Sequence, residues 1–189
     1  MESVLVVSSA DKGTAFFTDT LTAAAVEQIV ALQTSGEARR LLMERDFDLV
    51  IINAPLIDES GERLARDVAI KGISQVILVV KSEYFDEVSA ACESDGVLTV
   101  SKPINRTIFW SALMFAKSAG NRIKQMQAEN ERLKLKIDEI RIVDRAKCIL
   151  ISHMHMSEQD AHRYIEKQAM DMRMTRKSVA EGIIKTYEY

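Results

Sequence analysis

A heptad pattern over residues 121–144 constrains the fold of this chain more than any other stretch. Its apolar positions alternate at spacings of three and four residues, which is typical of the a and d positions of a two-stranded coiled coil. The other positions are almost all charged or polar, so the predicted helix has one face to bury. The predicted dimerisation seam consists of Ile123, Met126, Asn130, Leu133, Ile137 and Ile140.

Polar and charged side chains in this pattern favour a parallel homodimer. Asn130 at an a position reduces stability but favours an in-register pair, because each amide can bind its counterpart. In a parallel pair Glu129 faces Lys134 favourably, whereas Lys136 faces Arg141 unfavourably. A single solvated helix is the alternative interpretation.

The same register continues upstream and predicts one long helix that begins near Arg106. Gly120 lies within this stretch and weakens the helix by roughly 1 kcal/mol relative to alanine. The additional seam positions predicted by the extension are Phe109, Ala112, Ala116 and Ala119.

Five short apolar stretches precede the coil and alternate with helical patterns. Continuously apolar strands are typical of a parallel sheet that is covered by helices on both faces. Asp11 and Ser35 are the expected N-caps of the first two helices. Strands are expected at 3–7, 26–32, 48–53, 76–80 and 97–100, and helices at 11–24, 35–45, 62–71 and 83–93.

The chain has 189 residues, of which 47% are hydrophobic and 28% charged, as in a soluble globular protein of one or two domains. It has no N-terminal signal pattern and no apolar run of transmembrane length. Cys92 and Cys148 form no motif, and two free thiols are typical of a reducing compartment. We therefore expect a cytoplasmic protein without membrane contact.

Glycine, proline and lysine residues flank the predicted strands at characteristic places. Pro55 and Gly61 follow the third strand, Gly96 precedes the fifth, and Lys102 and Pro103 follow it. With the strand order, they make residues 1–119 resemble a response-regulator receiver domain, an α/β flavodoxin-like fold with a five-stranded parallel sheet. An unrelated α/β domain is the alternative.

The resemblance implies phosphoryl chemistry at the carboxyl ends of the strands, and this sequence departs from it. Asn53 stands at the phosphoacceptor position, and an amide cannot form an acyl phosphate. Ser8 and Ser9 replace the acidic pair that would hold Mg²⁺, which prefers charged oxygen ligands. Lys102 is retained, and we expect it to bind strand-end carbonyls or Asn53.

Two further positions differ from the receiver pattern. Val80 stands where a hydroxyl is usual after the fourth strand, and Thr99 stands where an aromatic residue is usual in the fifth. Asp58 is expected to be an ordinary turn residue. The receiver resemblance, taken with these departures, therefore implies a pseudo-receiver that has no phosphoacceptor, catalytic residue, metal or cofactor. It would take its signal from a protein partner, such as an inhibitory sensor of small molecules.

The C-terminal tail is predicted to form three short helices, which depend on the coil because they bury little area alone. The first continues the coil to residue 151, the second covers 157–172 and the third covers 175–186. Ser157 and Asp160 are expected to cap the second helix.

Charge is distributed unevenly along the chain. Residues 1–119 carry 11 basic and 17 acidic side chains, a net charge of −6, whereas residues 145–189 carry 8 and 6, a net charge of +2. This permits a nucleic-acid partner for the tail only. The expected organisation is a receiver-like domain over 1–119, a dimerising coil over 120–144 and a tail module over 145–189.

The tail helices carry a set of small, apolar and charged residues at defined spacings. They are Ala146, Lys147, Leu150, Ser157, Glu158, Ala161, Tyr164, Ala169, Met170, Ala180, Ile183 and Ile184. They resemble the ANTAR module, the RNA-binding domain of AmiR- and NasR-type transcription antitermination regulators. The resemblance implies a dimer that binds paired hairpins in a nascent leader transcript and prevents an overlapping terminator from forming. Cys148 stands where that family usually has glycine.

Basic side chains of the tail are the candidate RNA contacts, because Lys and Arg bind phosphates beside unstacked hairpin-loop bases. Arg163 and Lys167 lie four residues apart on one helical face. Tyr164 between them is expected to pack in the core rather than stack on a base. The first candidates are Lys147, Arg163 and Lys167, and the others are Arg145, Arg173, Arg176 and Lys177.

Other functions are less consistent with the tail. A DNA-binding response regulator needs a helix-turn-helix with a basic recognition helix, and none is clear. A protein-only adaptor stays open because the charge of the tail is small. His153 and His155 are a poor metal site, since residues two apart on a helix point to different sides. The methionines at 154, 156, 170, 172 and 174 are expected to pack in the core and caps. The sequence shows no arrangement of residues typical of an enzyme.

Overall fold

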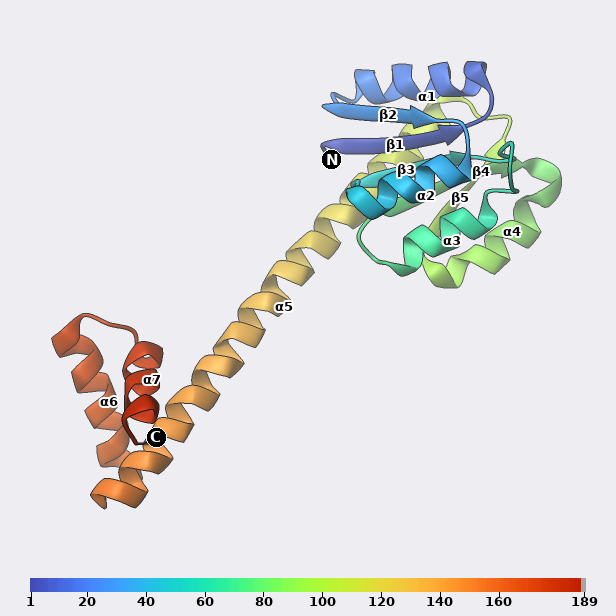
Figure 1. Ribbon diagram of the computed structural model, residues 1–189. Coiled ribbons are helices and arrows are strands. Elements are labelled where there is room, and N and C mark those ends of the chain that lie inside the picture. The colour runs from blue at the N-terminus through green and yellow to red at the C-terminus, as the bar shows by residue number, and fades with distance from the viewer. Residues whose placement is uncertain (188–189) are drawn as a thin grey trace. The chain divides into compact units, whose positions relative to one another are not determined.

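The computed structural model describes residues 1–187, which divide into two compact units (Figure 1). The first unit is Met1–Lys124, and the second begins at Gln125. Helix α5 (Arg106–Met154) contributes its first part to the first unit and the remainder to the second. Within the described range, no helix combines the length and hydropathy that a membrane span requires.

The first unit is built on a parallel sheet with the strand order β2-β1-β3-β4-β5. This is the order of the flavodoxin-like doubly wound fold. The predicted α/β fold with five parallel strands is therefore confirmed for the first unit. The strands are β1 (Ser3–Ser8), β2 (Gln28–Leu32), β3 (Leu49–Asn53), β4 (Gln75–Lys81) and β5 (Val97–Lys102).

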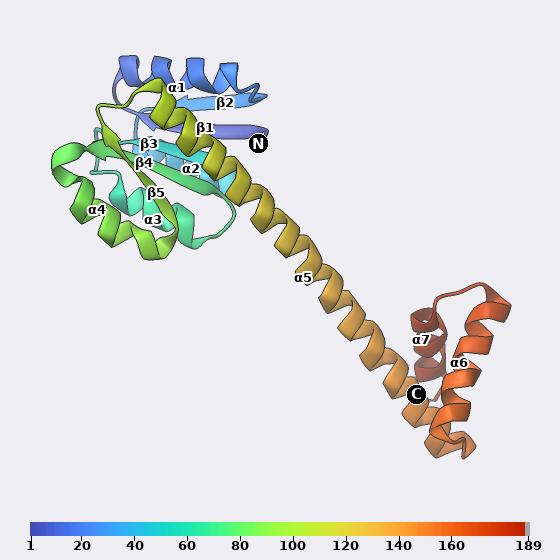
Figure 2. The same cartoon turned by 180° about the vertical axis from the view of Figure 1, so that it is seen from behind.

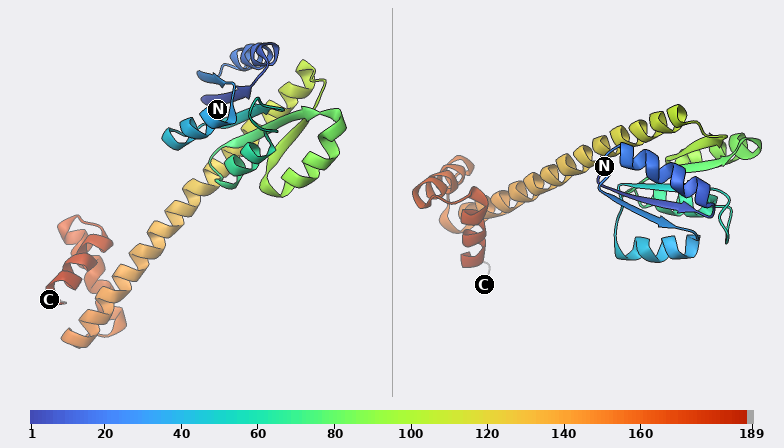
Figure 3. Two further views of the ribbon diagram at one scale, coloured as in Figure 1. Left: turned by 45° about the vertical axis from the view of Figure 1, so that its right-hand side comes forward. Right: turned by 90° about the horizontal axis from the view of Figure 1, so that it is seen from above.

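Helices cover both faces of this sheet. One face, in front in Figure 1, packs against α2 (Ser35–Glu44), α3 (Glu62–Ile70) and α4 (Phe85–Cys92). The opposite face, in front in Figure 2, packs against α1 (Asp11–Ala23) and the start of α5. The view from above in Figure 3 shows the sheet between α1 and α2.

Each face of the sheet has its own buried core. On one face Leu64 of α3 packs with Ile52 and Leu78. On the other, the rings of Phe17 and Phe109 join α1 to α5, with centroids 5.0 Å apart. Successive strand residues point to opposite faces, so continuously apolar strands supply both cores at once.

The second strand begins two residues later than predicted, at Gln28. The backbone N–H of Val26 donates to the carbonyl of Leu21 and so belongs to the end of α1. Ala25 then turns the chain with a φ of 54°. The apolar side chain of Val26 therefore closes a helix rather than opening a strand.

Both predicted N-caps were wrong by one residue. Thr34 caps α2, and its hydroxyl accepts from the Glu37 N–H at 3.2 Å, while Ser35 is the first helical residue. Ala10 precedes α1, which begins at Asp11. Adjacent polar residues satisfy the same cap pattern, and only backbone geometry distinguishes them.

The upstream extension of the coiled-coil seam was also wrong. Phe109 and Ala116 are buried in the core of the first unit, and Ala112 packs at its margin. A spacing of three and four residues describes a helix packed on a sheet as well as a coiled-coil seam. These side chains are therefore already covered by their own sheet.

In the second unit, α6 (Glu158–Met172) and α7 (Arg176–Tyr187) pack with the last turns of α5. The Ser157 hydroxyl caps α6 as predicted, accepting from the Asp160 N–H at 3.2 Å. The hydroxyl of Thr175 caps α7 in the same way. The predicted long helix followed by shorter helices is confirmed. Their buried core consists of Ala146, Leu150, Ala161, Ile165, Ala169, Val179 and Ala180.

Candidate functional site

The carboxyl ends of β1 and β3 place Ser8 and Asn53 side by side, and both are buried. Asn53 Nδ2 donates to Ser8 Oγ at 2.9 Å, and the Ser8 hydroxyl donates to the Ala10 carbonyl at 3.2 Å. A neutral hydrogen-bonded pair thus stands where the receiver pattern has carboxylates. Such a pair satisfies both polar groups without a metal ion.

Gly13 of α1 lies directly over this pair. A Cβ at this position would come within 2.5 Å of Asn53 Nδ2 and 3.1 Å of Ser8 Oγ. Atoms cannot approach so closely, so the absence of a side chain lets α1 cover the Asn53 amide. The sequence pattern gave no sign of this role for Gly13.

Lys102 and Ser9 bind backbone carbonyls at the same edge of the sheet. Lys102 Nζ donates to the Ala54 carbonyl, and Ser9 Oγ donates to the Pro55 carbonyl at 3.1 Å. Burial lowers the pKa of Lys102, and the positive charge of Lys81 lowers it further. Among residues 1–187, no group of three or more His, Cys, Asp or Glu side chains is arranged to hold a metal ion.

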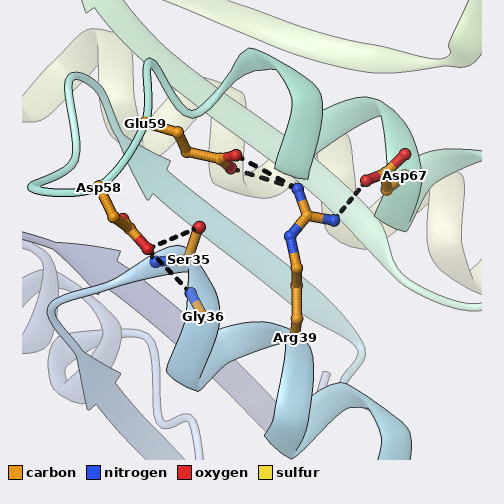
Figure 4. Close-up of polar contacts among 6 residues, drawn as sticks. All are labelled: Ser35, Gly36, Arg39, Asp58, Glu59 and Asp67. Atoms are coloured by element: carbon orange, nitrogen blue, oxygen red, sulfur yellow. Dashed lines mark hydrogen bonds and ion pairs between the residues drawn. The ribbon is translucent and has the colours of Figure 1, made fainter.

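Asp58 joins the loop after β3 to the N-terminus of α2 (Figure 4). Its carboxylate accepts from the Ser35 N–H at 2.9 Å, the Ser35 hydroxyl at 2.8 Å and the Gly36 N–H at 3.0 Å. These bonds, first that from the Ser35 backbone, hold the pKa of Asp58 at about 2. Asp58 thus lies in a turn, as expected, and it also satisfies amides that the helix itself leaves free.

One turn further along α2, Arg39 makes two ion pairs with the same region (Figure 4). Its guanidinium lies 3.3 Å from Glu59 and also pairs with Asp67 of α3. Partly exposed pairs such as these contribute only about 0–1 kcal/mol each. They add a second connection between α2 and the segment that follows β3.

Replacing Asp58 with asparagine is expected to lower the urea midpoint of unfolding at pH 7, because a neutral amide accepts weaker hydrogen bonds. The folded pKa of about 2 lies below the ordinary 3.8, so the stabilisation is present above 3.8 and disappears toward 2. The difference from wild type should shrink over that interval. Circular dichroism during urea unfolding measures it. Asp19→Asn on α1 is the control, and a pH-independent difference would contradict the assignment.

The seam residues of the second unit are exposed apolar side chains on α5. Met126, Leu133, Ile137 and Ile140 are between 48% and 65% exposed. Ile123, the last seam residue of the first unit, is 38% exposed. A row of large apolar side chains along one helical face is typical of a protein interaction surface.

Lys147, the first candidate RNA contact, is bound by carboxylates of its own unit. Its Nζ lies 2.8 Å from Asp144 and 3.2 Å from Glu158, and its side chain is 15% exposed. The hydrogen bond to Asp144, followed by that to Glu158, raises the pKa of Lys147. Lys147 therefore links α5 to the first turn of α6.

Arg176 and Lys177 of α7 also have carboxylate partners. Arg176 lies 3.6 Å from Glu166 and 4.0 Å from Glu139, and Lys177 lies 3.9 Å from Glu181. These pairs are partly exposed and contribute about 0–1 kcal/mol each, so a phosphate can exchange for the carboxylate.

Arg163, Lys167 and Arg173 are exposed, and no residue within 1–187 makes an ion pair or hydrogen bond with their side chains. Arg163 and Lys167 lie one turn apart on α6.

Tyr164 packs against the core, as predicted. Arg173 ends α6 in the left-handed conformation with a φ of 53°. Arg145 is exposed on α5.

The prediction that the tail methionines pack in the core was wrong for most of them. Met156 packs against the core, whereas Met170, Met172 and Met174 are 79%, 59% and 49% exposed. These three flank Arg173 at the turn between α6 and α7. Unbranched thioether side chains adapt to irregular surfaces, so this turn combines the cation of Arg173 with apolar contact area.

Residues 131–184 match the ANTAR domain, which covers the end of α5, α6 and most of α7. The chain therefore joins a unit with a receiver-like fold to an ANTAR domain.

The chain is similar to the transcriptional regulatory protein PdtaR of Mycobacterium tuberculosis, from strains CDC 1551 and H37Rv. This chain and PdtaR are 29% identical over 139 residues, which cover 74% of this chain and 68% of PdtaR.

Solved receiver domains share the fold of the first unit. The receiver domain of an HD domain-containing protein from Pseudomonas fluorescens matches with a TM-score of 0.56 and 22% identity, over 69% of this chain and 93% of that one. The receiver domain of a LuxO-type repressor from Vibrio parahaemolyticus matches with a TM-score of 0.58 and 18% identity, over 68% and 97%. Chemotaxis protein CheY4 of Vibrio cholerae matches with a TM-score of 0.54 and 18% identity, over 61% and 98%. At these identities the likeness concerns the fold alone.

Proposed function

We propose that this protein is a transcription antitermination regulator whose ANTAR module binds hairpins in a nascent leader transcript. The ANTAR match and the similarity to a transcriptional regulator support this class of function. The observation that carries RNA binding is the set of exposed cations Arg163, Lys167 and Arg173, which have no partner among residues 1–187, because free Lys and Arg bind phosphates.

The turn between α6 and α7 suits the loop of a hairpin. Bases in such loops are unstacked and present apolar faces, which exposed thioether side chains next to Arg173 can cover. In this proposal Lys147, Arg176 and Lys177 contribute after exchanging a carboxylate for a phosphate, and Arg145 adds charge from α5.

The proposed active form is a homodimer joined through the exposed seam of α5. Two modules then bind the two hairpins of one transcript, and the second binding event becomes intramolecular. The functional parts are the receiver-like domain over 1–119, the dimerising coil over 120–144 and the RNA-binding module over 145–189, acting in the cytoplasm where transcripts are made.

The receiver-like domain acts as a pseudo-receiver in this proposal and takes its signal from a protein partner, such as an inhibitory sensor. The buried pair of Asn53 and Ser8 supports this, since neither side chain can form an acyl phosphate or supply a charged ligand to Mg²⁺.

Incubation with Mg²⁺ and acetyl phosphate is expected to leave residues 1–119 without an acyl phosphate, because Asn53 is not a carboxylate. Intact-mass spectrometry measures the addition of a phosphoryl group, and a receiver with an aspartate at this position is the positive control. An acid-labile phosphoryl adduct on this chain would refute the pseudo-receiver.

A gel-shift with a two-hairpin leader RNA tests the proposed function, with single-hairpin RNA and duplex DNA as competitors. We expect preference for the two-hairpin RNA and a steep loss of binding with salt, because phosphate contacts release counterions. Equal competition by duplex DNA would support a DNA-binding regulator instead. Absence of nucleic-acid binding at low salt would support a protein-only adaptor.

A further inference from the structure

A cavity of about 530 Å³ opens in the first unit between α3 and α4, where the carboxyl ends of the strands lie. Leu78 and Val80 of β4 form its floor, and Val88 and Ala91 of α4 form one wall. Its volume lies within the range typical of small-molecule sites. In open α/β sheets, ligands bind at this end of the strands.

Small side chains border this space. Thr99 of β5, which does not itself line the cavity, lies in register beside Leu78, where the receiver pattern has a larger aromatic residue. The Thr99 hydroxyl is buried and has no hydrogen-bond partner among the described residues. Ala54 and Ala91 line the cavity where longer side chains would fill it.

The charges that line the cavity point to a positively charged ligand. Glu62 of α3 and Glu87 of α4 both line it, and neither forms an ion pair or hydrogen bond with a residue in the range 1–187. Lys81, the basic residue of the lining, already pairs with Glu83 at 3.3 Å. The lining thus holds two carboxylates and one ammonium group, so its net charge is negative, although Arg66 outside the lining lies near enough to Glu62 to interact with it electrostatically.

Tyr84 at the cavity adds a recognition surface of a second kind. Its side chain is 53% exposed while it lines the cavity together with Glu87. The face of an aromatic ring attracts organic cations by a cation–π interaction, and the ring also offers apolar contact area. A neighbouring carboxylate adds charge attraction.

We propose that the receiver-like unit carries an effector site for a small amphipathic amine between α3 and α4. The apolar body of the amine lies against Leu78, Val80 and Val88, and its ammonium group binds Glu62 and Glu87. This site allows direct chemical control of a domain that has an amide in place of the phosphoacceptor. It does not depend on RNA binding, so the two proposals can fail separately.

Titration of the full chain with 2-phenylethylamine tests the site, with 2-phenylethanol and 3-phenylpropionate as neutral and anionic probes. In two-dimensional NMR spectra we expect the amine to shift the amide signals of residues 78–91, with a Kd of about 1 mM for so small a probe. We expect the amine to bind about fivefold or more tightly than the alcohol, and the preference to fall with salt.

Two pairs of variants locate the site. Ala91→Phe fills the cavity and should abolish the shifts, whereas Ala90→Phe on the same helix should retain them. Glu62→Gln with Glu87→Gln should erase the preference for the amine, whereas Asp86→Asn should not. Circular dichroism establishes that each variant is folded. If Ala91→Phe unfolds, the charge variants at Glu62 and Glu87 still test the site. Equal binding of all three probes, or no shift at about 10 mM amine, would overturn the proposal.

Discussion

Replacing Leu133 and Ile137 together with aspartate is expected to convert the proposed dimer to a monomer and to cost about 10²–10⁴ in affinity for paired hairpins. Both side chains lie in the exposed apolar row of α5. In a parallel pair, four carboxylates would face one another at the seam and replace the apolar contact that holds the helices together. Affinity falls because each module then binds its hairpin independently.

Sedimentation equilibrium measures the first effect, and gel-shift titration of two-hairpin and single-hairpin RNA measures the second. Leu135→Asp is the matched control, because Leu135 is 66% exposed on the same helix but lies outside the seam. This control should remain dimeric. Single-hairpin affinity should change little in the seam variant. A dimer that survives the double substitution would place the interface elsewhere.

Replacing Arg163 and Lys167 with alanine is expected to weaken RNA binding by about tenfold or more and to reduce its salt dependence. Their side chains have no partner in residues 1–187, so the substitution removes no internal ion pair and stability should be unaffected. Each lost phosphate contact lowers the slope of log K against log salt by about 0.7–0.9.

The double variant Lys117→Ala with Arg122→Ala is the control for this experiment. It removes the same charge from exposed positions of the first unit. If the control loses as much affinity as the α6 variant, long-range charge and not contact by α6 explains the binding. An unchanged salt slope in the α6 variant would likewise exclude phosphate contacts by these two residues.

The sheet could be predicted from the sequence because a parallel strand covered on both faces is apolar at every position. Prediction from the sequence pattern failed where the same pattern is compatible with two different structures. The spacing of Phe109 and Ala116 fits a coiled-coil seam, but these residues face the sheet of their own unit. Val26 is apolar, as residues of buried strands are, but its N–H donates to the Leu21 carbonyl at the end of α1.

The polar contacts were less predictable than the elements that carry them. Asp58 binds Ser35 across 23 positions of sequence, and no local pattern reports such a contact. Lys147 could be recognised as a basic residue of the tail, but its carboxylate partner Glu158 lies on another helix. Helical spacing was enough to predict which apolar side chains of α5 share one face, and those of the second unit are exposed. That they form a dimer seam stays a prediction.

The close cover of Asn53 by Gly13 has a consequence for substitutions at Asn53. A single Asn53→Asp change would remove the amide that donates to Ser8 and bring a carboxylate to a site where Ser8 and Ser9 supply no charged ligand for a metal ion. Phosphotransfer at this position would therefore require several substitutions together, because Asn53→Asp alone supplies no acidic pair for a metal ion. In the proposed pseudo-receiver, a change at Asn53 alone would not bring the domain under the control of a phosphodonor.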